Sequence, residues 1–283
     1  MIKKGKLYLV TGGSGFLGTP LCARILNLGG RVRVLARSEG NLIKLKQLHP
    51  SVEILTGNVT DRFDVHQAVQ GVDGVFHLAA FKHVGMAEKQ VRACINSNTI
   101  GSLVILEETQ NLNLDFVLGI STDKAAQVAG VYGASKLLME RLFHQFSENN
   151  PGTKYRIVRY GNVLYSTGSV LCKWKELIEE GEGVIVTDFK ATRFYWTVDQ
   201  ALDLIFDCLE NAVDSNPFCP NMKALSIKDL LTAMIQKYAN GRDVPITTIG
   251  LQPGENLHEK VLDEGPFSNE AEQYTIDEIL EII

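Results

Sequence analysis

The chain has 283 residues, enough for a sizeable hydrophobic core, and its 45% apolar and 22% charged residues are ordinary for a globular protein. The net charge of −5 gives no electrostatic argument for nucleic acid as a partner, and the five scattered cysteines, with no CxxC pair, predict neither a disulfide framework nor a metal site. No apolar run is long enough for a membrane span or a signal peptide, so we expect a cytoplasmic protein without a membrane partner.

The first predicted strand, residues 7–10, runs directly into TGGSGFLG at residues 11–18, and a helical pattern follows over residues 16–28. Strand, glycine turn and helix form the context of a dinucleotide-binding fingerprint, although an ordinary tight turn is the alternative. Glycines let the backbone approach a pyrophosphate, and the helix N-terminus attracts that anion. The expected cofactor contacts are Gly12, Ser14, Gly15, Phe16, Leu17 and Gly18.

The second predicted strand, residues 31–36, ends in Arg37 and Ser38 rather than in the acidic residue that usually binds the ribose of NAD. A guanidinium and a hydroxyl suit a 2′-phosphate, so the sequence favours NADP as the cofactor. A solvated surface arginine is the alternative, and the nearby Glu39 keeps NAD possible.

Strands are predicted at residues 52–56 and 74–78, and residues just beyond or at their ends are candidates for the cofactor. Asn58 and Val59 are expected to meet an adenine ring. Leu78, Ala79 and Ala80 are expected to lie along the cofactor, because small residues leave room there. Lys82 and His83 are candidates for substrate or cofactor phosphates, with a solvated loop as the alternative.

A helix over residues 98–111 and a strand over residues 115–120 lead into the stretch ISTDKAAQVAGVYGASK at residues 120–136. Thr122, Asp123 and Lys124 are predicted where the strand ends. Tyr132 and Lys136 are predicted on the first turns of a helix over residues 132–149, where positions i and i+4 share a face. An ammonium there is expected to lower the pKa of the phenol, which then takes a proton from a substrate hydroxyl; an ordinary surface pair is the alternative.

Strands alternate with helices up to a strand at residues 155–160, which predicts an α/β fold with a doubly wound parallel sheet. We expect a Rossmann domain over residues 1–165 and a mainly substrate-binding lobe over residues 166–283, with residues 197–211 returning to the first domain. Helices are predicted at 169–180, 198–211, 226–238 and 275–283, a short strand at 184–186, and loops at 216–217 and 219–220.

Several motifs resemble one enzyme family: AAFKHV (79–84), STDKAA (121–126), VYGASK (131–136), RYGNV (159–163), GSV (168–170), TRF (192–194) and PGE (253–255). They are similar to extended short-chain dehydrogenase/reductases that act on nucleotide sugars. The best match is the inverting, C5-epimerising branch of the UDP-N-acetylglucosamine 4,6-dehydratases, and it runs from about residue 6 to residue 261. Departures include Gln252 and Asn256, where the family carries positive side chains around its PGE motif.

The resemblance implies an NADP-dependent lyase that converts UDP-N-acetylglucosamine into UDP-2-acetamido-2,6-dideoxy-β-L-arabino-hex-4-ulose by transient hydride transfer. It implies that Tyr132, with Lys136, removes the C4 hydroxyl proton while Thr122 hydrogen-bonds that hydroxyl. Lys124 then removes the C5 proton, and Asp123 protonates the departing C6 hydroxyl. Because Lys124 has to be neutral to act as a base, we expect Lys136, the cofactor's positive charge and burial to lower the pKa of Lys124.

The resemblance also implies substrate contacts by Asn162, Arg193 and Glu255, with Arg193 placed for a phosphate. It implies a homo-oligomer, a dimer or larger, built on the helices at residues 98–111 and 132–149. Two other hypotheses remain. A nucleotide-sugar 4-epimerase or 5,6-dehydratase would keep Tyr132 and Lys136, and a non-catalytic NADP sensor would need the fold alone.

Overall fold

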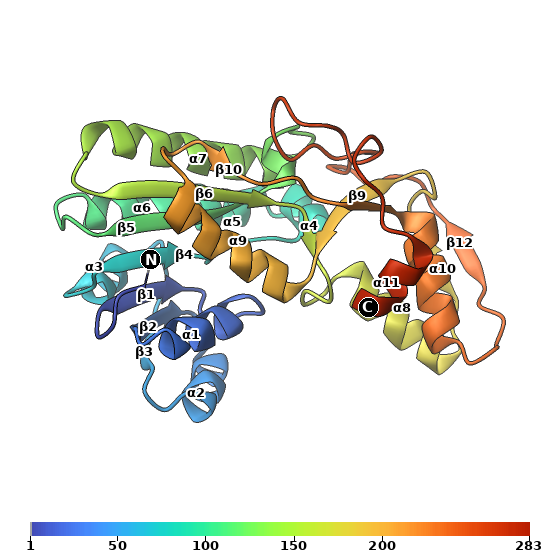
Figure 1. The fold of residues 1–283 in the computed structure, drawn as a ribbon, viewed down its shortest axis with the longest axis horizontal. Helices are drawn as coiled ribbons and strands as arrows, with labels where there is room; N and C mark the ends of the chain where they lie inside the picture. Colours follow the sequence, from blue (N-terminus) through green and yellow to red (C-terminus); the bar gives the residue numbers. More distant parts are fainter. Residues whose placement is uncertain (1) are drawn as a thin grey trace.

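A computed structural model describes residues 2–283 and is centred on a parallel sheet of seven strands (Figure 1). Across the sheet they are β10 (Pro217–Phe218), β6 (Lys154–Tyr160), β5 (Phe116–Thr122), β4 (Gly74–His77), β1 (Leu7–Thr11), β2 (Arg31–Ala36) and β3 (Glu53–Thr56). All neighbours pair in parallel, and the chain reverses its direction of travel across the sheet between β1 and β4. The predicted doubly wound parallel sheet is confirmed. Ligands in such sheets bind where this reversal leaves a crevice at the carboxyl ends of the strands.

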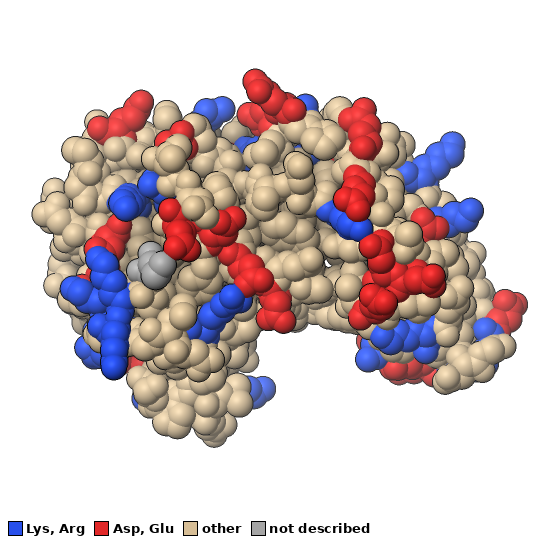
Figure 2. Space-filling view, in the orientation of Figure 1, with Lys and Arg blue, Asp and Glu red and all other residues tan. Residues whose placement is uncertain are grey.

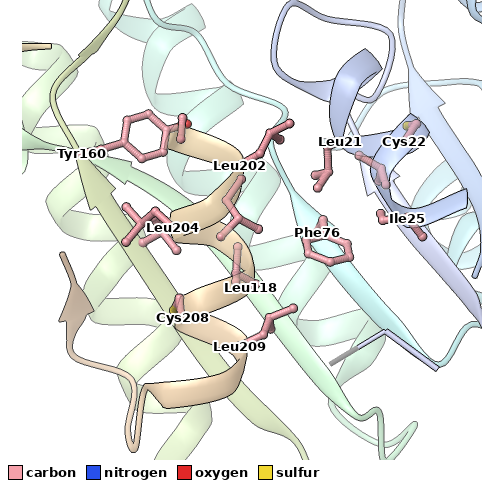
Figure 3. Packing of buried hydrophobic residues seen from close by; sticks show 14 of the residues in the cluster. Leu21, Cys22, Ile25, Phe76, Leu118, Tyr160, Leu202, Leu204, Cys208 and Leu209 are labelled. Atoms are coloured by element: carbon pink, nitrogen blue, oxygen red, sulfur yellow. The ribbon is translucent and has the colours of Figure 1, made fainter. Parts of the chain in front are cut away.

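Helices cover both faces of this sheet, because its strands are buried on both sides and alternate residues point to opposite faces. On one face lie α1 (Gly18–Asn27), α2 (Glu39–Leu48) and α9 (Val198–Asn211). On the other lie α3 (Arg62–Val69), α6 (Gly101–Thr109) and α7 (Val131–Asn149). Figure 3 shows side chains of α9 meeting Phe76 and Leu118 of the sheet, so this late helix returns to the first part of the fold.

The region before α6 differs from the single helix predicted over residues 98–111. It contains α4 (Val84–Lys89), α5 (Val91–Ile95) and a π-helical turn, Asn96–Ile100, that continues into α6. The turn buries Asn98, whose side chain bonds the backbone N–H and carbonyl of Phe81 at 2.7 and 2.9 Å and the Ser135 hydroxyl at 2.9 Å. Hydrophobic periodicity does not reveal such a turn, because it changes the helix repeat only locally.

The edge strand β10 is a second difference, since residue 217 was predicted within a loop and no strand was predicted at residues 217–218. They pair with Ile157 and Val158 of β6. A two-residue strand beside prolines leaves no pattern of alternating hydrophobicity, and only its neighbour on the sheet defines it.

The rest of the chain forms a second packed part beside the first (Figure 1). Its strands are β7 (Asn162–Val163), β9 (Thr192–Trp196) and β11 (Ala224–Ser226) in one sheet, and β8 (Val184–Val186) and β12 (Ile246–Thr248) in another. Its helices are α8 (Val170–Glu180), α10 (Ile227–Tyr238) and α11 (Ile276–Ile282). Trp174, Leu230 and Ile279 lie in its core, and Figure 2 shows the molecule hollowed between the two parts.

Over residues 2–283, no helix is both long enough and apolar enough to cross a lipid bilayer.

Candidate active site

A cleft of about 640 Å³ lies at the carboxyl ends of the central strands. Every residue predicted to contact the cofactor lines it, from Gly12 to Gly18, through Arg37, Ser38, Asn58 and Val59, to Leu78, Ala79 and Ala80. Thr122, Lys124, Tyr132, Lys136, Lys82, His83 and Asn162 line the same cleft. Three predicted site residues, Asp123, Arg193 and Glu255, do not line it.

The glycine turn brings bare backbone up to this cleft. Gly12 has a φ of +68°, and a β-carbon there would lie 3.0 Å from the backbone of Ala79. A β-carbon on Gly18, at the start of α1, would collide with the carbonyl oxygen of Gly12. Only glycine therefore allows the turn, the β4 strand end and the helix N-terminus to approach so closely. A cradle of this kind fits the pyrophosphate of a dinucleotide.

The end of the cleft that was predicted to hold the adenosine is formed by short turns after β2 and β3. The Ser38 hydroxyl accepts a bond of 3.4 Å from the Asn41 N–H and so caps α2, while Arg37 lines the cleft beside it. The Asn58 side-chain oxygen accepts a bond of 3.2 Å from the Thr60 N–H. This bond orders the turn at the cleft wall.

The strand β5 extends to Thr122, two residues further than predicted, and a single 3₁₀ turn, Asp123–Ala125, follows. One carboxylate oxygen of Asp123 accepts bonds from the Thr122 hydroxyl at 2.7 Å, the Lys124 backbone N–H at 2.9 Å and the Lys124 ammonium at 3.0 Å. The other oxygen of this fully buried carboxylate has no hydrogen-bond partner. Asp123 is thus bonded to its chain neighbours behind the cleft wall, and Lys124 is the member of the pair that lines the cleft.

Tyr132 and Lys136 share the first turns of α7, as predicted, but the lysine does not act on the phenol as expected. Burial raises the pKa of Tyr132 to about 12, and the cation that opposes this rise most is Lys124. The Lys136 ammonium donates instead to the carbonyl of Ile120 at 2.6 Å, and burial lowers its pKa to about 8 against the attraction of Glu140. The expectation that Lys136 lowers the pKa of Tyr132 is therefore wrong for this structure.

The expected fall in the pKa of Lys124 is also wrong. Burial lowers this pKa, but Asp123 and Glu259 raise it by more, and the net result lies above the usual range of a lysine. The predicted fall considered only cations and burial, whereas two carboxylates, Asp123 and Glu259, face Lys124. In this structure Lys124 rests as an ammonium ion.

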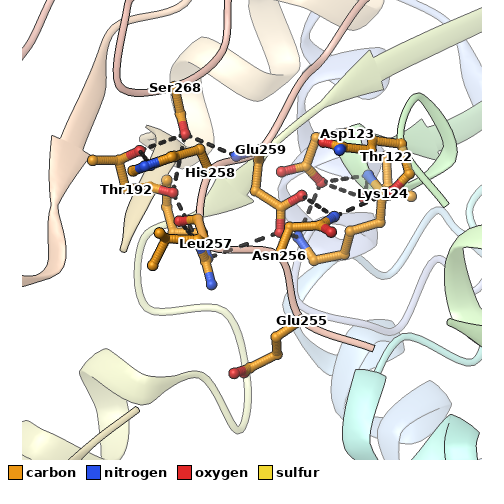
Figure 4. Close-up of polar contacts among 12 residues, drawn as sticks. Thr122, Asp123, Lys124, Thr192, Glu255, Asn256, Leu257, His258, Glu259 and Ser268 are labelled. Atoms are coloured by element: carbon orange, nitrogen blue, oxygen red, sulfur yellow. Dashed lines mark hydrogen bonds and ion pairs between the residues drawn. The ribbon is translucent and has the colours of Figure 1, made fainter. Parts of the chain in front are cut away.

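Glu259 is the functional candidate that the sequence analysis missed (Figure 4). It is fully buried, and one of its oxygens lies 3.5 Å from the Lys124 ammonium. Arg193, expected at a substrate phosphate, lies with its Nε 3.9 Å from the same oxygen and donates to the carbonyls of Thr192 and Leu257. Glu255 points away from this cluster and accepts a bond from the Gln252 N–H at 3.0 Å. The signal available was an acid four residues beyond the PGE motif.

The chain is similar in sequence and fold to several known proteins. A family model described as a polysaccharide biosynthesis protein matches residues 8–281. An uncharacterized membrane protein of Methanocaldococcus jannaschii is 34% identical over 94% of this chain and 83% of its own. A solved structure, Pen from Bacillus thuringiensis, superposes with a TM-score of 0.91 at 28% identity and covers 99% of this chain and 98% of its own.

Two further relatives carry names of different activities at the same identity of 29%. One is the UDP-N-acetylglucosamine 4,6-dehydratase (inverting) of Campylobacter jejuni serotype O:2, with 95% of this chain and 81% of the relative covered. The other is the UDP-glucose 4-epimerase of Rickettsia conorii, with 91% and 77% covered.

Proposed function

This chain belongs to the polysaccharide biosynthesis protein family, and from that premise we propose that it is a nucleotide-sugar 4,6-dehydratase. Its substrate would be UDP-N-acetylglucosamine, dehydrated with inversion at C5 to the 4-keto-6-deoxy sugar. A bound NADP, which the glycine turn and Arg37 would hold, would supply a hydride acceptor at C4 and a hydride donor at C6. The observation that carries the proposal is the 3.0 Å contact between the buried Asp123 and Lys124, which lines the cleft together with Tyr132.

One proton shared by Asp123 and Lys124 accounts for both halves of water loss. At rest the pair is a carboxylate and an ammonium. Moving the proton along the 3.0 Å contact makes a free amine and a carboxylic acid. The amine takes the C5 proton, the acid gives its proton to the departing C6 oxygen, and water leaves. The pair then returns to ammonium and carboxylate, so protons balance.

Thr122 and Tyr132 would serve the C4 hydroxyl. Both line the cleft next to Lys124. Taking the C4 proton requires a phenolate, and burial raises the pKa of Tyr132 to about 12. Filling the cleft with a positively charged ring has to lower this pKa, because an adjacent cation favours the ionised phenol.

The substrate diphosphate would lie near Lys82, His83 and Asn162, on the side of the cleft toward the second part of the molecule. The Lys82 ammonium donates to the carbonyl of Thr167 at 3.0 Å. Burial lowers the pKa of the His83 ring, and the nearby cations Lys82 and Lys173 lower it further. A diphosphate would reverse that effect, because it favours the charged imidazole.

A homo-oligomer built on α6 and α7, extended to α5, is part of the proposal. Val91 and Ile95 of α5, Ile100 of the π-helical turn and Leu138 of α7 are exposed, with between 39 and 51% of their surface accessible. Exposed apolar side chains grouped on packed helices are typical of an interface. Light scattering of the purified protein tests the oligomer, and a monomer at all concentrations would refute this part.

The direct test is incubation of the protein with UDP-N-acetylglucosamine and NADP in heavy water. We expect the product to have lost the mass of one water and to carry one deuterium at C5. The 4-epimerase named among the relatives is the second candidate, and it predicts an unchanged mass with a new sugar. It has no use for an acid–base pair at C5 and C6, which is why the Asp123–Lys124 contact favours dehydration. A sugar that remains unaltered in mass and identity would refute both activities.

A further inference from the structure

A cluster of four charged side chains lies behind the cleft wall at Lys124. It consists of Asp123, Lys124, Arg193 and Glu259, two carboxylates and two cations, and only Lys124 lines the cleft (Figure 4). Both carboxylates are fully buried. Charges at such depth persist only when they are paired, so the members depend on one another.

The two carboxylates hold Lys124 in different ways. The bonded oxygen of Asp123 accepts three hydrogen bonds. The oxygen of Glu259 that faces Lys124 at 3.5 Å and Arg193 at 3.9 Å accepts none, and the other accepts one from Asn256 at 3.2 Å. Glu259 therefore acts on Lys124 mainly through its charge, at low dielectric, where such attraction is strong.

Side-chain hydrogen bonds hold Glu259 in place, because the segment that carries it, residues 256–268, has no helix or strand. Its backbone N–H donates to the Ser268 hydroxyl at 2.9 Å. That hydroxyl donates to the Thr192 carbonyl at 3.1 Å and pairs with the Thr192 hydroxyl at 2.6 Å. The Thr192 hydroxyl also meets a ring nitrogen of His258 at 2.8 Å. These contacts fix the segment to β9.

A second attachment ties the same segment to the main sheet. Arg159, nearly fully buried on β6, forms an ion pair of 2.6 Å with Glu140 of α7. Its remaining nitrogen donates to the carbonyl of Val261 at 2.9 Å. The Glu259 carboxylate is thus anchored from both parts of the molecule, which fixes its distance from Lys124.

The titratable and charged groups that face Lys124 come from four elements. Asp123 lies in the 3₁₀ turn, Glu259 in the segment 256–268, Arg193 and Tyr195 on β9, and Tyr132 on α7. The two carboxylates favour a protonated Lys124, while Arg193 opposes it. Glu259 is the carboxylate that the proposed acid–base step leaves unused.

We propose that Glu259 is a positioning residue that keeps the shared proton on the Asp123–Lys124 pair and thereby sets the upper pH limit of the reaction. The consequence for catalysis rests on the proposed function; the effect on the Lys124 proton does not. With Glu259 present the pair holds its proton to higher pH. Without it, the pair loses the proton at lower pH, and the acid that protonates the departing C6 oxygen is no longer available.

The rate of amine acylation measures the fraction of Lys124 that is unprotonated, because only the free amine reacts. Wild type, Glu259→Gln and the matched control Glu264→Gln, an exposed acid on the same segment, are treated with acetic anhydride across a pH series. Peptide mass spectrometry gives the rate at Lys124. We expect about tenfold faster acetylation at Lys124 in Glu259→Gln at fixed pH, from a pKa lower by roughly one unit. The control keeps the wild-type rate, and an unchanged rate in Glu259→Gln would overturn the proposal.

Activity gives the second measurement. The alkaline limb of kcat/KM should move down by about one pH unit in Glu259→Gln and stay in place in Glu259→Asp, which keeps the charge. If no dehydration occurs, the acetylation still decides the role of Glu259. If Glu259→Gln does not fold, wild-type Lys124 tests the premise: the pH of half-maximal acetylation must lie above the value of about 10.4 typical of an exposed lysine, and a midpoint at or below it overturns the proposal.

Discussion

The glycine turn at residues 11–18 and the C-terminal segment at residues 256–268 both serve the cleft region, and they are built in opposite ways. The turn joins a strand to a helix, and Gly12 and Gly18 make its close approaches possible. The segment has no helix or strand and depends on side-chain bonds to β9 and β6. Binding geometry is thus encoded within a few neighbouring residues, whereas the charge environment of Lys124 is assembled from distant parts of the chain.

Lys124 lines the same cleft as the glycine turn and faces Glu259 of the segment, so its replacement has the largest expected effect. Lys124→Met should reduce dehydration by about 10²- to 10⁴-fold, the usual contribution of a general base. Cofactor affinity should remain, because the glycine turn is intact. Product mass, C5 deuterium and cofactor titration measure these effects, with the exposed Lys44→Met as control. Wild-type C5 exchange in Lys124→Met would remove the base role.

The attachment of the segment is tested at Arg159. Arg159→Met leaves Glu140 buried without its partner and should lower the free energy of unfolding by about 3–5 kcal/mol. Urea denaturation measures this loss. The double variant Arg159→Met, Glu140→Met should recover most of it, because an apolar pair replaces the ions. Asp263→Asn, which removes the exposed partner of Arg159, should cost at most about 1 kcal/mol. Equal losses in the two single variants would contradict a buried anchor.

The turn is tested at Gly18. Gly18→Ala forces a β-carbon onto the Gly12 carbonyl and should cost about 1–3 kcal/mol of stability, with weaker cofactor binding. Gly40→Ala is the matched control, since nothing lies within 4 Å of a β-carbon there and the residue sits in α2. That control should gain up to about 1 kcal/mol. Thermal unfolding and cofactor titration distinguish the two, and a neutral Gly18→Ala would refute close packing at the turn.

Cofactor choice carries the smallest expected effect. Arg37→Ala should weaken NADP binding by at least about tenfold and leave NAD binding nearly unchanged, because a charge-assisted bond to a 2′-phosphate is worth about 1.5 kcal/mol or more. Fluorescence titration with both dinucleotides measures the ratio. Equal losses for the two cofactors would mean that Arg37 does not contact the distinguishing phosphate.

Much of the fold follows from local pattern. The strand at residues 31–36 and the helix at residues 198–211 agree with β2 and α9 residue for residue. Asp61 caps α3 and Ser226 caps α10, because their side-chain oxygens accept backbone N–H bonds at the start of each helix. Apolar alternation and capping are short-range properties, so a single sequence carries them.

The sequence alone determined the parallel sheet, the glycine turn and the spacing that sets Tyr132 and Lys136 on one helix face, because each depends on residues close along the chain. Tertiary structure decided the direction in which the pKa of each ionisable group in the site shifts. Lys136 turned to a backbone carbonyl, Arg193 turned to a carboxylate, and Glu259 arrived beside Lys124 from a segment more than a hundred residues away. Local sequence patterns do not predict these contacts, since the distance between two charges depends on how elements that are distant along the chain pack together.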